Sequence, residues 1–112
     1  MTFKKRVEIL LPTHYESTLN NGKYEKINGD EYVTTYKELT NWFRGCTYDP
    51  TVKKGEWVDN NGKKYSDDST TLYCDIDNTK KNNQFWIEYK EILKKRFKQK
   101  DIYIAFHDVE VI

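Results

Sequence analysis

Apolar and polar residues alternate with a period of two in three parts of the chain. Val7–Leu11 places three aliphatic side chains on one side, which is typical of a strand with one buried face. Pro12 cannot donate a backbone hydrogen bond to a neighbouring strand, so we expect this strand to end there. Residues 70–77 and 102–112 show the same alternation and predict two further strands.

Two other segments carry apolar residues at helical spacing. Residues 31–43 place Tyr32, Tyr36, Leu39 and Phe43 on one stripe, which predicts an amphipathic helix. A second helix is predicted over residues 85–97, and its inward face consists of Phe85, Trp86, Tyr89, Ile92, Leu93, Arg96 and Phe97.

Capping residues set the expected ends of the first helix. Asp30 is suited to the N-cap because a short acidic side chain accepts hydrogen bonds from the first free backbone N–H groups. Gly45 is suited to the left-handed conformation that commonly ends a helix.

Turn residues divide the remaining chain. Residues 14–29 form a long polar connection with Asn20–Gly22 as a turn, and we expect a small hairpin around Tyr24. Asn60–Gly62 lies between two short extended arms, a pattern that predicts a β-hairpin over residues 57–65.

The order of these elements predicts an α+β fold. Two amphipathic helices cover one face of a four-stranded sheet in a two-layer sandwich. The right-handed connections then favour the ferredoxin-like βαββαβ arrangement, with the hairpin at residues 57–65 added to it. We expect one domain over residues 1–112.

Composition narrows the function classes. Nineteen basic residues against 18 acidic residues give a net charge of +1, so a protein that depends mainly on phosphate contacts with nucleic acid is not expected. No segment has the length of a membrane span, and the first residues lack the pattern of a secretory leader, so we predict a cytoplasmic protein. Cys46 and Cys74 lack the paired spacing of a metal site and are expected to be free, buried thiols.

The predicted sheet leaves one face uncovered, and this face carries the candidate site. Alternation along the strands places a mixed set of polar and aromatic side chains there: Glu8, Tyr73, Asp75, Tyr103 and His107. Exposed patches of this kind mark interaction or ligand sites. The first hypothesis is therefore a non-catalytic interaction or small-ligand-binding module that forms a homodimer through this face, with the ligand not identified.

An enzyme is the alternative hypothesis. His107 with a carboxylate across the face, from Asp75 or Glu8, would form an acid–base pair. Asp75 and Asp77, with Asp67 and Asp68 upstream, also suggest a weak Mg²⁺ site. We assign no catalytic residue, metal ligand or cofactor on these patterns alone.

Several motifs resemble a family of small uncharacterised bacterial proteins called DUF3574. They are a helix ending in Phe-x-Gly-x-Thr (Phe43, Gly45, Thr47), a Gly-x-Trp hairpin (Gly55, Trp57) with a following glycine (Gly62), and a glutamine before the last strand (Gln99). The resemblance covers Val7 to Ile112 and departs at residues 66–68, where Ser-Asp-Asp replaces a glutamate. It implies this fold but no activity. The motif residues have structural explanations, and the functional hypothesis is that Trp57, Tyr65 and Gln99 form the rim of a pocket.

Overall fold

The computed structural model describes residues 1–16 and 23–112 of the chain. Its elements, in order, are β1 (Thr2–Pro12), β2 (His14–Glu16), β3 (Tyr24–Lys26), α1 (Gly29–Phe43), β4 (Thr47–Val58), β5 (Lys64–Ile76), α2 (Lys80–Arg96) and β6 (Ile104–Val111). The small hairpin expected around Tyr24 is present as the β2–β3 pair. The turn predicted at residues 20–22 lies outside the described residues.

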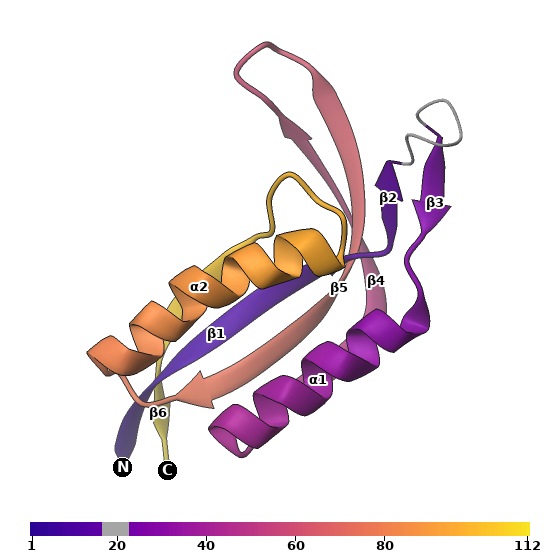
Figure 1. Cartoon of the computed structure of the whole chain (residues 1–112). Helices are drawn as coiled ribbons and strands as arrows, with labels where there is room; N and C mark the ends of the chain where they lie inside the picture. The colour runs from indigo at the N-terminus through magenta and orange to yellow at the C-terminus, as the bar shows by residue number, and fades with distance from the viewer. Residues whose placement is uncertain (17–22) are drawn as a thin grey trace.

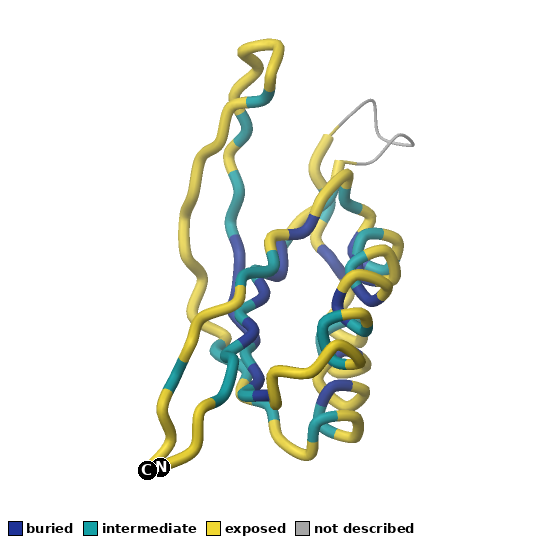
Figure 2. Tube along the Cα trace, turned by 90° about the vertical axis from the view of Figure 1, so that its left-hand side faces the viewer, coloured by how far each residue is buried: buried dark blue, intermediate teal, exposed yellow. Residues whose placement is uncertain are grey.

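The main sheet has four strands in the order β4-β5-β1-β6, and each neighbouring pair is antiparallel. Both helices lie on one side of this sheet (Figure 1). Buried residues line the space between the two layers, while the opposite face of the sheet is uncovered (Figure 2). The predicted α+β class is therefore confirmed, with the helices on a single face.

The core lies between the sheet and the helices. Alternate residues of β1 and β5 supply its sheet side: Val7, Ile9, Leu11, Leu72, Cys74 and Ile76. The helices and the segment after α2 supply the other side: Leu39, Trp86, Tyr89, Leu93, Phe97 and Ile102. The register pairs Ile9 with Leu72 and Val7 with Cys74, so the alternation read from the sequence gives the correct inward face of both strands.

Two predicted helix positions and both predicted caps of α1 are wrong. Tyr36 and Ile92 are 39% and 47% exposed, so they lie outside the buried stripes. Thr35 is buried instead. Its hydroxyl donates a hydrogen bond to the backbone oxygen of Glu31, so it can be buried without a water molecule as partner.

The start of α1 is capped by Asn28, whose side chain accepts from the backbone N–H of Asp30. Asp30 therefore lies inside the helix, in the first turn, where its negative charge interacts favourably with the positive end of the helix dipole. At the other end Arg44 adopts the left-handed conformation (φ 63°), one residue before the expected Gly45.

The predicted additional hairpin is the outer part of the main sheet. β4 and β5 each continue past the other strands and pair with each other up to Val58 and Lys64. A register shift between Asp49 and Lys53 accommodates Pro50 within β4. Gly62 has a φ of 81°, as the predicted turn requires. The outer halves of β4 and β5 therefore form an arm that extends beyond the two layers (Figure 1).

Within the described residues, neither helix is long and apolar enough to cross a membrane.

Candidate functional site

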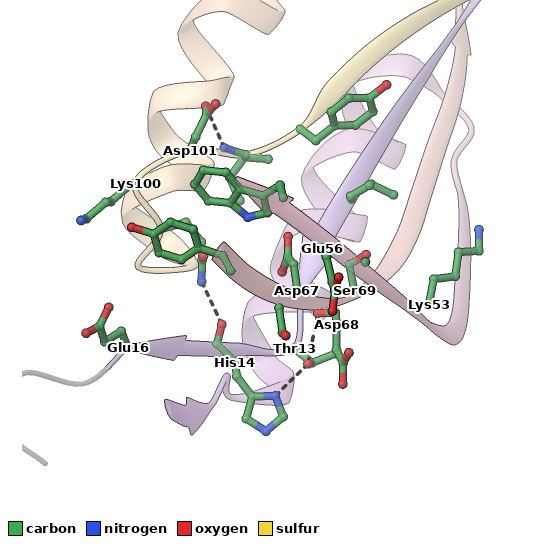
Figure 3. A pocket seen from close by; sticks show the side chains of 18 of the residues that line it. Thr13, His14, Glu16, Lys53, Glu56, Asp67, Asp68, Ser69, Lys100 and Asp101 are labelled. Carbon is green, nitrogen blue, oxygen red and sulfur yellow. Dashed lines mark hydrogen bonds between the residues drawn. The ribbon is translucent and has the colours of Figure 1, made fainter. Parts of the chain in front are cut away.

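A groove of about 920 Å³ lies at the end of the sheet where the arm begins. One wall consists of residues 53–57 of β4 and 65–69 of β5. The other walls are residues 13–16, at the start of the β2–β3 hairpin, and residues 98–104, which connect α2 to β6. Figure 3 shows the side chains of these three segments converging on the same space.

Backbone contacts fix the three segments relative to one another. The backbone N–H of Thr13 donates to the backbone oxygen of Asp68 at 2.9 Å, which ties the start of the small hairpin to β5. The side-chain nitrogen of Gln99 donates to the backbone oxygens of His14 (2.9 Å) and Phe97 (3.0 Å). Gln99 therefore both caps the end of α2 and holds the connecting segment against the hairpin.

Two stacked aromatic rings form part of the arm side of the groove. Trp57 and Tyr65 are register partners, and their ring centroids lie 4.3 Å apart with planes 12° from parallel. The Tyr65 hydroxyl donates to a carboxylate oxygen of Asp59 at 3.2 Å, which orients its ring. Trp57 is 46% exposed, so part of its ring remains available to a ligand. Tyr103 contributes a third ring from the α2–β6 connection.

Asp67 supplies negative charge to the same wall. Residues 65, 67 and 69 alternate along β5, so Asp67 lies on the same side of the strand as Tyr65. Burial, and to a lesser degree the adjacent carboxylate of Asp68, raises the pKa of Asp67. Among the described residues no cation lies within ion-pair distance of Asp67.

Several other charged side chains of the groove have partners. Lys90 pairs with Asp101 at 2.9 Å, and Glu56 pairs with Lys64 at 3.0 Å. The Lys98 ammonium group lies 4.3 Å from the centre of the Tyr15 ring. Asp67 thus differs from these groups, because its charge is held partly out of water without a neutralising contact.

His14 lies on the rim and is oriented by Thr13. The Thr13 hydroxyl donates to the backbone oxygen of Asp68 at 3.2 Å and lies 2.8 Å from Nδ1 of His14. Since the hydroxyl hydrogen is used, Nδ1 is assigned as the donor and Nε2 is left to accept a proton. The contact with Thr13 therefore holds the His14 ring in one orientation at the edge of the groove.

The residues predicted for the open sheet face divide between two places. The register aligns Glu8 with Tyr73, and places Asp75 and His107 on either side of Arg6. These four predicted side chains share the uncovered face. Tyr103 lies at the groove instead.

On the open face the charges neutralise one another. Arg6 makes two hydrogen bonds to Asp75, at 2.8 and 3.0 Å, and its guanidinium lies 4.5 Å from the centre of the Tyr73 ring. The hydrogen bond from Arg6 lowers the pKa of Asp75. His107 faces Glu8, with 3.5 Å between Nε2 and Oε2, so the structure does not bring His107 to Asp75.

The predicted Mg²⁺ carboxylates are also separated by their partners. Asp77 pairs with Lys4, as Asp75 does with Arg6. In the part of the chain that the structure describes, no three His, Cys, Asp or Glu side chains form a cluster suited to a metal ion.

The rim predicted from Trp57, Tyr65 and Gln99 is present, since all three line the groove. Sequence reasoning did not connect this rim with Asp67, Asp101 or the β2–β3 hairpin. The acidic pair at residues 67–68 was visible, but its position relative to Trp57 depended on the length of β4 and β5.

No protein-family model matches the chain, and no curated protein matches it in sequence. A solved structure does match: a phage SAM lyase in complex with S-methyl-5'-thioadenosine. The match has a TM-score of 0.55 and 10% sequence identity, and it covers 97% of this chain and 89% of that one. At this identity the similarity concerns the fold.

This similarity contradicts the first hypothesis from the sequence, a non-catalytic module that dimerises through its open sheet face. The matching fold is that of an enzyme in complex with a small molecule. The ion pairs of Asp75 and Asp77 agree with this correction, because they satisfy side chains of the open face within the chain itself.

Proposed function

We propose that this chain is a small enzyme that binds S-adenosylmethionine in the groove and releases S-methyl-5'-thioadenosine. The observation that carries the proposal is the similarity to the SAM lyase over nearly the whole chain. The groove supplies the second line of support, because it offers aromatic rings and an unpaired carboxylate in one space.

The ligand's chemistry suits these side chains. S-adenosylmethionine carries a flat adenine ring, for which Trp57 and Tyr65 provide a stacking surface. Its sulfonium centre is a cation, and aromatic faces and carboxylates both attract cations. Asp67 is a half-buried carboxylate of the groove, and among the described residues it has no cation partner. A volume of about 920 Å³ lies within the range of small-molecule sites.

The proposed reaction breaks the bond between the sulfonium sulfur and the four-carbon methionyl chain. Both electrons of this bond go to sulfur, which becomes the neutral thioether of S-methyl-5'-thioadenosine. The four-carbon chain closes on its own carboxylate, so neither water nor an external base is consumed. The protein's contribution is to hold the ligand's methionyl chain in a folded geometry. In that geometry the ligand's carboxylate lies close to the carbon bonded to sulfur.

The proposal is tested by incubating the protein with S-adenosylmethionine and separating the products by liquid chromatography with mass spectrometry. We expect S-methyl-5'-thioadenosine to form in proportion to enzyme concentration. Glu110→Gln, an exposed substitution on β6 away from the groove, serves as the matched control and should retain full activity. The absence of both product formation and calorimetric binding of S-methyl-5'-thioadenosine would refute the proposal.

We also propose that the architecture is the ferredoxin-like arrangement predicted from the sequence. The strand order β4-β5-β1-β6 and the two helices on one face support it. The β2–β3 hairpin and the arm are then additions that build the groove. The resemblance to DUF3574, the homodimer and the cytoplasmic location stay predictions.

A further inference from the structure

We propose that Cys46 and Cys74 form a disulfide bond that fastens the first residues of β4 to β5. The two thiols lie on the opposite half of the β4–β5 hairpin from the groove. The inference therefore stands on its own and does not depend on the proposed enzymatic function.

The strand register brings the two cysteines together. Thr47 pairs with Tyr73, so the next opposed positions are Cys46 and Cys74. Their sulfur atoms lie 2.9 Å apart, although both cysteines carry free thiols in this structure. Directly opposed residues of antiparallel strands have Cβ separations only slightly above those of a disulfide, so bond formation needs a small backbone adjustment.

The surroundings allow that adjustment. Cys46 precedes the first residue of β4 and follows the end of α1, so no ladder pairing fixes it on its N-terminal side. A Cβ placed on Gly45 would meet no atom within 4 Å, which indicates free space beside this segment. Cys74 is held firmly, because it pairs with Val7 of β1 and is 1% exposed.

The two thiols differ in access to an oxidant. Cys46 is partly exposed, whereas Cys74 is buried. The contact with Cys46 and burial both raise the pKa of Cys74, so Cys46 is the thiol that reacts first. A low-molecular-weight disulfide, such as oxidised glutathione, is the proposed oxidant.

The exchange takes two steps. The Cys46 thiolate attacks one sulfur of the small disulfide and expels one small thiolate. Cys74 then loses its proton and attacks the Cys46 sulfur, which expels the second small thiol. The protein loses two hydrogen atoms and two thiols become one disulfide, while the small disulfide is reduced to two thiols.

The bond would link residues 28 positions apart and enclose β4 with most of β5. This loop contains the arm that carries Trp57 and Asp67. Restricting the unfolded chain in this way favours the folded state, with a rise in Tm on the order of 10 °C.

The test compares reduced protein with protein equilibrated against oxidised and reduced glutathione. We expect an intact mass lower by two hydrogen atoms, loss of both free thiols, a cross-linked peptide containing Cys46 and Cys74, and the higher Tm. Cys46→Ala is the matched control, and its Tm should not respond to the oxidant. Cys74→Ala, which removes the buried thiol, should instead gain one glutathione at Cys46.

Either of two results would overturn the inference. Wild-type protein that accumulates one glutathione at Cys46 without the cross-link would show that Cys74 does not reach it. Wild-type protein with two free thiols in excess oxidised glutathione would show that the pair does not react. An unchanged Tm after cross-linking would contradict the predicted stabilisation of the hairpin.

Discussion

Charged and aromatic side chains gather on two parts of this molecule, the open face of the sheet and the groove at the base of the arm. On the open face two acids form ion pairs with cations, as Asp75 does with Arg6 and Asp77 with Lys4. In the groove Asp67 is half-buried beside another carboxylate and has no such partner among the described residues.

The two carboxylates consequently have opposite pKa shifts. The hydrogen bond from Arg6 lowers the pKa of Asp75, whereas burial raises that of Asp67. A charge that is neutralised within the chain contributes to stability and attracts a charged ligand only weakly. A charge that is desolvated and unpaired costs stability, and groups of this kind cluster at functional sites. The comparison therefore supports placing the proposed ligand site in the groove and not on the open face.

The largest expected effect is a difference in catalytic activity between variants of the two carboxylates, Asp67 and Asp75. Asp67→Asn removes the negative charge that attracts the sulfonium, and we expect kcat/KM for S-adenosylmethionine to fall by about 100-fold. Asp75→Asn, the matched substitution on the open face, should leave kcat/KM within about twofold. Initial rates of S-methyl-5'-thioadenosine release measure both. Equal losses of kcat/KM in the two variants would contradict the proposal that the ligand site lies in the groove and not on the open face.

The next effect distinguishes two exposed tryptophans by ligand affinity. Trp57→Ala removes a ring from the groove, and we expect the Kd for S-methyl-5'-thioadenosine to rise by about 10-fold, since stacking of one base on a ring is worth roughly 1–3 kcal/mol. Trp42, which is 55% exposed and stacks on Phe85 in the helix layer, provides the matched control.

Trp42→Ala removes the same kind of ring from the other side of the molecule and should leave the Kd unchanged. Isothermal titration calorimetry measures both constants. An affinity that falls in the Trp42 variant and persists in the Trp57 variant would place the ligand outside the groove.

The inner strands of this fold were predicted well from the sequence, because apolar residues occupy alternate positions along their buried face. The alternation around Ile9 and Leu72 identified the inward faces of β1 and β5. Helix faces were less accurate, because the burial of Thr35 depends on a hydrogen bond to its own helix. The end of α1 was misplaced by one residue for a similar local reason, the left-handed backbone of Arg44.

The groove was harder to predict, because it depends on how far strands continue and how distant segments meet. A register shift between Asp49 and Lys53 carries β4 past Pro50 and lengthens the strand beyond the predicted hairpin. Trp57, Tyr65 and Gln99 were recognised as a rim through motif spacing alone. Their association with Asp67 arises from the β4–β5 pairing and from the Gln99–His14 contact, which joins residues 85 positions apart.

A smaller effect concerns stability on the open face. Asp75→Asn breaks the two-bond pair with Arg6 and should lower the free energy of unfolding by about 1 kcal/mol at pH 7. Because the folded-state pKa of Asp75 is lowered, its contribution is present above the unfolded-state pKa and is lost as the pH falls through the folded-state value. Urea unfolding between pH 7 and pH 3 should therefore show the wild type and Asp75→Asn converging in acid.

The smallest effect has the opposite sign and tests the comparison most directly. The folded-state pKa of Asp67 is raised, so the folded protein holds this proton more tightly than the unfolded chain. The resulting stabilisation is complete below the unfolded-state pKa and is lost as the pH rises through the folded-state value. At pH 7 the ionised group therefore costs stability, and Asp67→Asn should raise the free energy of unfolding by roughly 0.5 kcal/mol, a small value because the group is partly exposed. The gain should shrink toward pH 4, as the wild-type carboxylate takes up its proton. A variant that is less stable than the wild type at pH 7 would mean that Asp67 has a partner in the folded protein, and the contrast between groove and open face would then fail at the residue on which it depends.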